Sequence, residues 1–332
     1  MSSCQLADEV ADAVIAKFRL IHSQPVSGQI VLAGMVAVIN AASVQVVSLG
    51  VGNKFEPAGA KREEALRDCH AEILARRAFK LFLLREHEKL TKGGENSDFF
   101  FLTDNGRLGA FSSVQWVLYI SSCPCGNACV RRWGDSPKET FDTSLLPFEM
   151  PPKVPHATFL AHARHEGQTA LSVKGESTIL SCSDKILKWS VNGLEGVGLS
   201  GITETRILLD AVVVGRKFVR KHAERAFCCR LNSKWIDPQL RALVSHPLAL
   251  CTGRKLDDGA MDAETGASFT DAVLWWSDSH GTEEIDGSTG KRTDGSPSAL
   301  CPLVLRSMIP VPPDPHRVAT SKLLELEMFK NL

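Results

Sequence analysis

The chain has 332 residues, 44% hydrophobic and 23% charged, a composition that is typical of a folded globular protein and excludes a disordered or collagen-like one. Its 38 basic and 38 acidic residues balance, so any polyanionic partner must be bound by a local basic patch. The ten cysteines do not suit a disulfide scaffold, the N-terminus is acidic and no apolar run reaches ~20 residues, so we expect a reduced, intracellular protein of the cytoplasm, the nucleus or both.

Hydrophobic periodicity predicts alternating helices and strands along the chain. We expect, in order, a helix over 5–20, a hairpin of strands 30–39 and 44–50, a helix over Asp68–Lys89, a strand over 116–120, a helix over 183–189 and a strand over 207–214. This alternation predicts an α/β fold in a single domain over residues 1–332.

Two segments are interpreted as loops. A proline-rich insertion occupies residues 134–157, and an acidic stretch rich in glycine and serine occupies residues 256–297. Gly196–Gly201 has the spacing G-x-G-x-x-G, but it follows a predicted helix rather than a strand, so we expect no dinucleotide.

The first segment with chemical potential is Cys69-His70-Ala71-Glu72, at the start of the long predicted helix. With Asp68 as N-cap, His70 and Glu72 fall in the first turn and both can face one cavity. A tripeptide of this kind also occurs by chance on solvated helix ends, so alone it is weak evidence.

The second segment is Cys123-Pro124-Cys125-Gly126-Asn127-Ala128-Cys129, between a strand and a predicted helix start. Thiols at a helix N-terminus have a lowered pKa, which prepares them as metal ligands. Zinc deaminases of bases carry H-x-E followed by P-C-x-x-C. Here Cys129 falls one residue late, so either it compensates or the third ligand lies elsewhere. Strand-end cysteines packed as small hydrophobic residues are the alternative.

The third segment, Ser181-Cys182-Ser183-Asp184-Lys185, places another cysteine just before a predicted helix. One ligand from each of three helix starts, His70, Cys125 and Cys182, would leave a fourth tetrahedral position open, as in catalytic zinc sites. The competing interpretation is a structural four-cysteine site that includes Cys123 and Cys129 and leaves His70 and Glu72 unused.

Together these segments resemble the A-to-I RNA-editing adenosine deaminase family, the adenosine deaminases acting on RNA and on tRNA, and most closely its tRNA-specific members. The matching stretches are Val31–Gly34, Ser48–Lys54, Asp68–Arg77, Ser122–Ala128 and Ser181–Trp189. The resemblance implies a cytidine-deaminase-like α/β fold with a central mixed sheet and helices on both faces.

The resemblance also implies the roles of individual residues. His70, Cys125 and Cys182 correspond to zinc ligands, and Glu72 corresponds to the proton shuttle of a hydrolytic deamination of adenosine to inosine. Asn53 and Lys54 correspond to residues beside the target nucleotide.

The implied partner is RNA. The opening Leu6–Ala11 resembles the start of the tRNA-acting members, and no double-stranded-RNA-binding module fits upstream of Val31, so we expect the adenosine on the 3′ side of a tRNA anticodon as substrate. Editing of other, double-stranded RNA and a catalytically inactive RNA-binding relative are the alternatives. Lys217, Lys221 and Arg225, spaced i, i+4 and i+8, are expected to line a basic helical face.

Inositol hexakisphosphate is the second cofactor that the resemblance implies. The corresponding residues are Arg76, Arg77, Lys185, Lys188 and Trp189. Lys188, Glu195 and Pro302 depart from the family's pattern, which has an arginine, a glutamine and a lysine at these positions.

Overall fold

A computed structural model describes most of the chain. The described residues are 1–22, 30–55, 63–92, 96–126, 128, 163–164, 171–172, 180–232, 236–255, 271–277, 282–287 and 289–329. The predicted proline-rich loop over 134–157 and Cys129 lie outside these residues.

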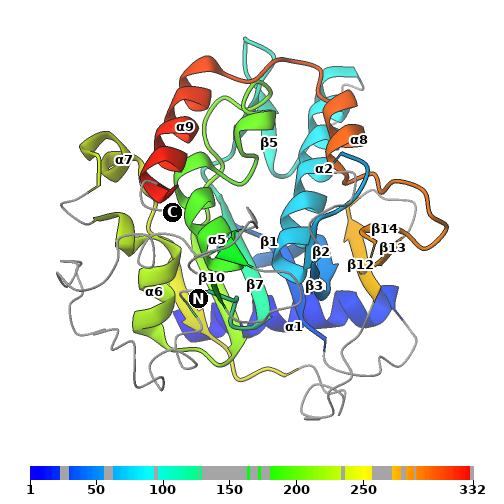
Figure 1. Cartoon of the computed structure of the whole chain (residues 1–332), viewed down its shortest axis with the longest axis vertical. Helices are drawn as coiled ribbons and strands as arrows, with labels where there is room; N and C mark the ends of the chain where they lie inside the picture. Colours follow the sequence, from blue (N-terminus) through cyan, green and yellow to red (C-terminus); the bar gives the residue numbers. More distant parts are fainter. Residues whose placement is uncertain are drawn as a thin grey trace.

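An eight-stranded mixed sheet forms the centre of the protein (Figure 1). Its strands, in spatial order, are β11 (Leu248–Cys251), β10 (Ala211–Arg216), β7 (Val114–Ser122), β1 (Leu32–Ile39), β2 (Ser43–Val51), β12 (Asp271–Trp276), β13 (Glu283–Asp286) and β14 (Lys291–Arg292). β10 runs parallel to β7 and β11, and the other neighbours are antiparallel. The predicted hairpin is β1–β2.

Helices cover both faces of the sheet because the side chains of β7 alternate between two cores. Val117 and Tyr119 pack with α1 (Ser3–Ile21), whereas Trp116, Leu118 and Ile120 pack with α2 (Ala71–Lys92) and α5 (Cys182–Asn192). Figure 1 shows α1, in dark blue, on one face, and α2 and α5 on the other. The predicted fold class is therefore confirmed.

Smaller elements surround this layer. They are the pairs β3 (Asn53–Phe55) with β4 (Asp68–His70), β5 (Phe100–Leu102) with β6 (Leu108–Ala110) and β8 (Ala163–Arg164) with β9 (Leu171–Ser172), the helices α6 (Arg220–Phe227), α7 (Pro238–Leu243), α8 (Pro302–Ser307) and α9 (Pro315–Phe329), and the 3₁₀ turns η2 (Val197–Leu199) and η3 (Cys229–Asn232). Among the described helices, none combines the length and the apolar character that a membrane crossing requires.

Two predictions about elements were wrong. The helix predicted from Asp68 begins at Ala71, because residues 68–70 pair with residues 53–55 as a strand, a long-range contact that periodicity does not register. The stretch 256–297, predicted to be loops, contains β12, β13 and β14. β12 is an apolar run that pairs with β2, and β13 and β14 extend the sheet from it to the edge.

Candidate metal centre

Three segments far apart in sequence bring metal-type ligands together. His70 ends β4, Cys125 follows β7 and Cys182 is the first residue of α5. Their ligand atoms all lie within 4.8 Å of one another. The His70 Nδ1 is 3.3 Å from the Cys182 Sγ, and the Cys182 backbone N–H donates to the Cys125 Sγ at 3.2 Å. As expected of ligands at helix starts, Cys182 begins α5 and His70 directly precedes α2, whereas most of the segment that follows Cys125 lies outside the described residues.

The donor set fits zinc. One imidazole and two thiols are ligands that zinc prefers, and two such ligands on one tetrahedral ion lie about 3.5–3.8 Å apart. The observed separation of 3.3 Å between His70 and Cys182 is close to this value. Cys182 is 1% exposed and His70 9%. Three protein ligands leave one coordination position for a water molecule, as in catalytic sites.

Backbone geometry at Gly126 and two serines hold the Cys125 loop against the start of α5. Gly126 has φ of 97°, and a Cβ there would lie 2.2 Å from the Ser181 Oγ, so only glycine fits. The Ser183 hydroxyl donates to the Cys125 carbonyl at 2.7 Å and accepts from the Ala128 backbone N–H at 3.1 Å. The position of Cys125 relative to Cys182 is therefore set by the protein itself.

The competing four-cysteine site receives no support from the described residues. The Cys123 thiol donates to the Ala128 carbonyl at 3.2 Å, and Cys123 is not among the ligands that converge. Cys129, the other member of that alternative, lies outside the described residues.

Glu72 lies in the first turn of α2 and is 3% exposed. Burial raises the pKa of the Cys182 thiol, and the neighbouring Cys125, Glu72 and Asp68 raise this pKa further. The centre therefore brings together two thiols and two carboxyl groups whose ionised forms a bound cation would stabilise.

Asp68 connects this centre to the start of α5. Its Oδ1 accepts from the His70 backbone N–H at 3.0 Å and lies 2.8 Å from the His70 Nδ1, and its Oδ2 pairs with the Lys185 ammonium. Asp68 is therefore not the helix N-cap that its sequence position predicts. Its contact with the His70 backbone N–H instead holds the backbone of His70 in place, and it lies next to Nδ1, the ring nitrogen that also faces the Cys182 Sγ.

The two residues expected beside a nucleotide lie on β3. Asn53 is opposite His70 and Lys54 is opposite Cys69 in the β3–β4 ladder. The strand therefore runs directly beside the ligand His70. The side chain of Lys54 is outside the described part of the structure.

A basic cluster of Arg76, Arg77 and Lys80 lies on α2, beginning about one turn after Glu72. Arg76 packs over the Trp189 ring at 5.0 Å, and Arg77 donates to the Leu300 carbonyl at 3.0 Å. Burial and the charge of Arg77 lower the pKa of Arg76 to about 9, and burial with both arginines lowers the pKa of Lys80. Sequence reasoning missed Lys80, although its i, i+4 spacing from Arg76 places both on one helix face.

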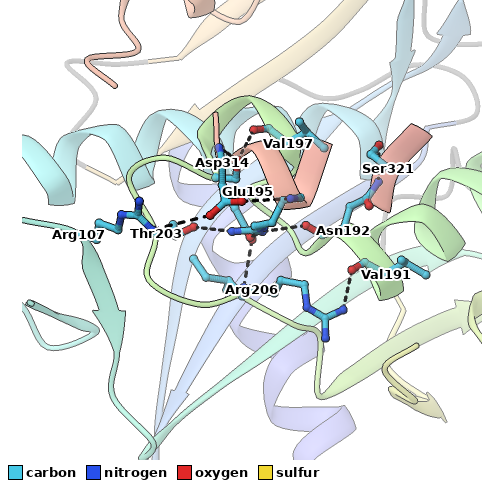
Figure 2. A network of polar contacts seen from close by, with 12 residues as sticks. Arg107, Val191, Asn192, Glu195, Val197, Thr203, Arg206, Asp314 and Ser321 are labelled. Carbon is cyan, nitrogen blue, oxygen red and sulfur yellow. Dashed lines mark hydrogen bonds and ion pairs between the residues drawn. The ribbon is translucent and has the colours of Figure 1, made fainter. Parts of the chain in front are cut away.

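Lys188 and Glu195, two of the residues that depart from the family's pattern, each form an ion pair with a residue of α9. The Lys188 ammonium pairs with Glu325 of α9 at 2.7 Å. Glu195 is fully buried and pairs with Arg317 of α9, and its Oε2 accepts from the Ile207 backbone N–H at 3.1 Å. Figure 2 shows Glu195 within the polar network that also contains Thr203, Asn192 and Asp314.

The expected basic helical face is only partly present. Lys217 and Lys221 are exposed, but Lys217 precedes α6 and has φ of 58°. Arg225 is 1% exposed, so its placement on a surface for RNA was wrong. The short helix α6 packs Ala223, Ala226 and Phe227 into the interior and carries Arg225 inward with them.

The Adenosine-deaminase (editase) domain family matches residues 48–307. The double-stranded RNA-specific adenosine deaminase of Mus musculus is 30% identical over 270 residues, 74% of this chain and 22% of that protein. The double-stranded RNA-specific editase B2 of Mus musculus is 30% identical over 328 residues, 89% of this chain and 41% of that protein. The tRNA-specific adenosine deaminase 1 of Schizosaccharomyces pombe is 42% identical over 87 residues, 25% of this chain and 22% of that protein. The chain thus spans less than half the length of each of these relatives.

Proposed function

The chain belongs to the adenosine-deaminase (editase) domain family, and from this premise we propose that it catalyses the hydrolytic deamination of adenosine to inosine in RNA. The observation that carries the proposal is the convergence of His70, Cys125 and Cys182 beside the buried Glu72. A set of ligands with one open position, next to a buried carboxylate, is the arrangement that a hydrolytic deaminase requires.

We assign the roles as follows. His70, Cys125 and Cys182 hold a zinc ion, which when bound supplies a water molecule whose pKa is lowered to roughly 7. Glu72 would accept one proton from water and donate it to N1 of adenine as the water oxygen adds to C6. It would then accept the second proton, from the new C6 hydroxyl, and pass it to the amino group as the C6–N bond breaks. Water and adenosine give inosine and ammonia, so the carboxylate ends in its starting state. Asn53 and Lys54 contact the nucleotide beside the reacting base.

We propose tRNA as the RNA, with the adenosine on the 3′ side of the anticodon as the target. Loop bases are unstacked or easily turned out, so presenting one to a buried centre costs little free energy. The 42% identity to a tRNA-specific deaminase over 87 residues supports this choice, whereas the longer matches are to relatives named for double-stranded RNA. Such a substrate would place the protein in the cytoplasm or the nucleus.

The substrate proposal is tested by incubating the zinc-loaded chain with unmodified tRNA and, separately, with a long RNA duplex, and by sequencing both for inosine. Inosine at one anticodon-loop adenosine, with little in the duplex, supports the tRNA assignment. The reverse preference would replace tRNA by double-stranded RNA, and binding of either RNA without inosine would favour the inactive relative.

We propose inositol hexakisphosphate as a second ligand, held by Arg76, Arg77 and Lys80 against Trp189. In the described part of the chain the buried Nε of Arg76 has no hydrogen-bond partner. The charge of Arg77 lowers the pKa of Arg76, and both arginines lower the pKa of Lys80, so a polyanion would stabilise the cluster. Lys185 and Lys188 are paired with Asp68 and Glu325, so we expect them to contribute less.

This cofactor is tested independently of activity. The purified chain is denatured in acid, and the released small molecules are analysed for inositol phosphates by mass spectrometry. Recovery of the compound from the wild type, with loss in an Arg76→Gln, Lys80→Gln variant, supports the proposal. Its absence from folded wild-type protein would reject it.

A further inference from the structure

A second group of metal-type ligands lies at the end of α6, apart from the centre described above. It consists of Cys228, Cys229 and His246, whose ligand atoms all lie within 4.8 Å of one another. The two sulfur atoms are 3.2 Å apart. Within the described residues, this group and the His70 group are the two sets of three such side chains that come together.

The backbone on both sides of this group is held by one residue of α5. The Ser190 hydroxyl donates to the Phe227 carbonyl at 2.7 Å, directly before Cys228. The Ser190 carbonyl accepts from the Ser245 backbone N–H at 2.8 Å, directly before His246. The two cysteines and the histidine are therefore brought together by hydrogen bonds that need no metal.

A small apolar core packs against Cys228 and so supports the group of two cysteines and a histidine. Leu231, Leu240 and Val244 pack with Cys228 in one cluster, and Leu231 and Leu240 are fully buried. His246 is exposed, whereas Cys228 is 2% exposed. The group is thus anchored on its inner side and accessible to an ion from solvent on its outer side.

We propose that Cys228, Cys229 and His246 form a second binding site for a thiophilic divalent metal ion such as zinc. Two thiolates on one tetrahedral zinc lie about 3.8 Å apart, so the observed sulfur atoms need to separate by only a small amount. The exposed side leaves room for a water molecule as the fourth ligand.

The ion would join the C-terminal end of α6 to the segment that leads into β11. Because a metal that binds only the folded state stabilises it, the second site would raise the melting temperature of the chain in zinc. The proposal does not depend on the deaminase assignment, since no ligand is shared.

The test measures bound zinc per chain in full-length reduced protein after loading and exhaustive dialysis. We compare the wild type with a Cys229→Ser, His246→Ala variant and with Cys251→Ser, a matched control that removes an exposed cysteine of β11. We expect the double variant to hold one equivalent less than the wild type and the control to hold the same amount. Cobalt loading of a Cys182→Ser variant should still produce the absorption band of thiolate-bound cobalt.

Three outcomes would overturn the proposal. These are equal zinc in the wild type and the Cys229→Ser, His246→Ala variant, loss of all cobalt–thiolate absorption in Cys182→Ser, and an intact mass of wild-type protein lower by two hydrogens without metal, which would indicate a Cys228–Cys229 disulfide instead. Circular dichroism confirms that each variant is folded before its metal is counted.

Discussion

The ammonium of Lys185 donates to the carboxylate of Asp68, which precedes it by 117 residues, and the same carboxylate lies 2.8 Å from the imidazole of His70. One buried carboxylate therefore connects the N-terminal turn of α5 to the first of the candidate zinc ligands. Because Asp68 also accepts from the His70 backbone N–H, the position of His70 is linked to a charge on α5.

Replacing Lys185 by Met should therefore affect both stability and metal binding. The substitution leaves Asp68 buried without its cation, which should cost about 3 kcal/mol of unfolding free energy. Because Asp68 also accepts from the His70 backbone N–H, movement of the unpaired carboxylate should displace His70, and zinc affinity should fall about tenfold or more. Urea denaturation and competition with a zinc chelator measure the two effects.

Lys188→Met is the matched control, since Lys188 lies three residues further along α5 and pairs with the half-exposed Glu325. This substitution should lower the free energy of unfolding by less than about 1 kcal/mol and leave zinc affinity unchanged. Equal effects of the two substitutions would show that the Asp68 contact has no special role.

Replacing Cys182 by Ser should remove one equivalent of bound zinc. A serine hydroxyl is a poor zinc ligand, and His70 and Cys125 alone do not complete a stable site. Bound metal is measured after dialysis, with Cys4→Ser, at an exposed cysteine of the N-terminus, as control. If Cys182→Ser kept its zinc, Cys123 or Cys129 would be the third ligand.

The buried pair of Glu195 and Arg317 should show strong coupling. Arg317→Leu alone leaves the fully buried Glu195 carboxylate without its cation and should lower the free energy of unfolding by about 3–5 kcal/mol. The same change in a Glu195→Gln background should lower it much less. Urea denaturation of the four proteins yields the coupling energy, which we expect to exceed about 1 kcal/mol. Additive costs would mean that the contact contributes through packing alone.

Removing two exposed positive charges should weaken RNA binding and its salt dependence together. Each lost phosphate contact lowers the slope of log affinity against log salt by about 0.7–0.9, so Lys217→Gln with Lys221→Gln should lower it by about 1.5. Binding is measured by filter retention or fluorescence at several salt concentrations. Lys92→Gln, at the far end of α2, is the control, and an unchanged slope in the double variant would exclude this surface.

The sequence predicted the fold class because its strongest elements carry local signals. The continuous apolar run of Trp116–Ile120 and the periodicity of α1 can be read directly from neighbouring residues. By contrast, β4 forms only because Asp68–His70 finds a distant strand, and β13 and β14 lie in acidic, glycine-rich sequence that local propensity assigns to loops. The apolar run Ala272–Trp276 of β12 is a strand signal that the composition of the wider stretch concealed.

The sequence predicted the residues of the candidate site that lie in short motifs, but not those that are brought in by tertiary contacts. Cys182 joins His70 across 112 residues, so spacing left the third ligand open and the family resemblance pointed to it. Arg225 has the charge of a surface residue, and its burial follows from how the short helix α6 packs. The pairing of Glu195 with Arg317 and the position of Ser190 between Phe227 and Ser245 depend on tertiary contacts, which the local pattern does not contain.

The central claim is that Glu72 moves the proton in an adenosine deamination. The measurement that tests it most directly is inosine formation in unmodified tRNA, read by sequencing, with the wild type beside Glu72→Gln. The substituted amide keeps the size of the side chain and cannot accept the proton, so we expect inosine from the wild type, at least about a hundredfold less from the variant, and equal zinc in both. Inosine formed equally by both proteins, or by neither when both are folded and loaded with zinc, would contradict the account.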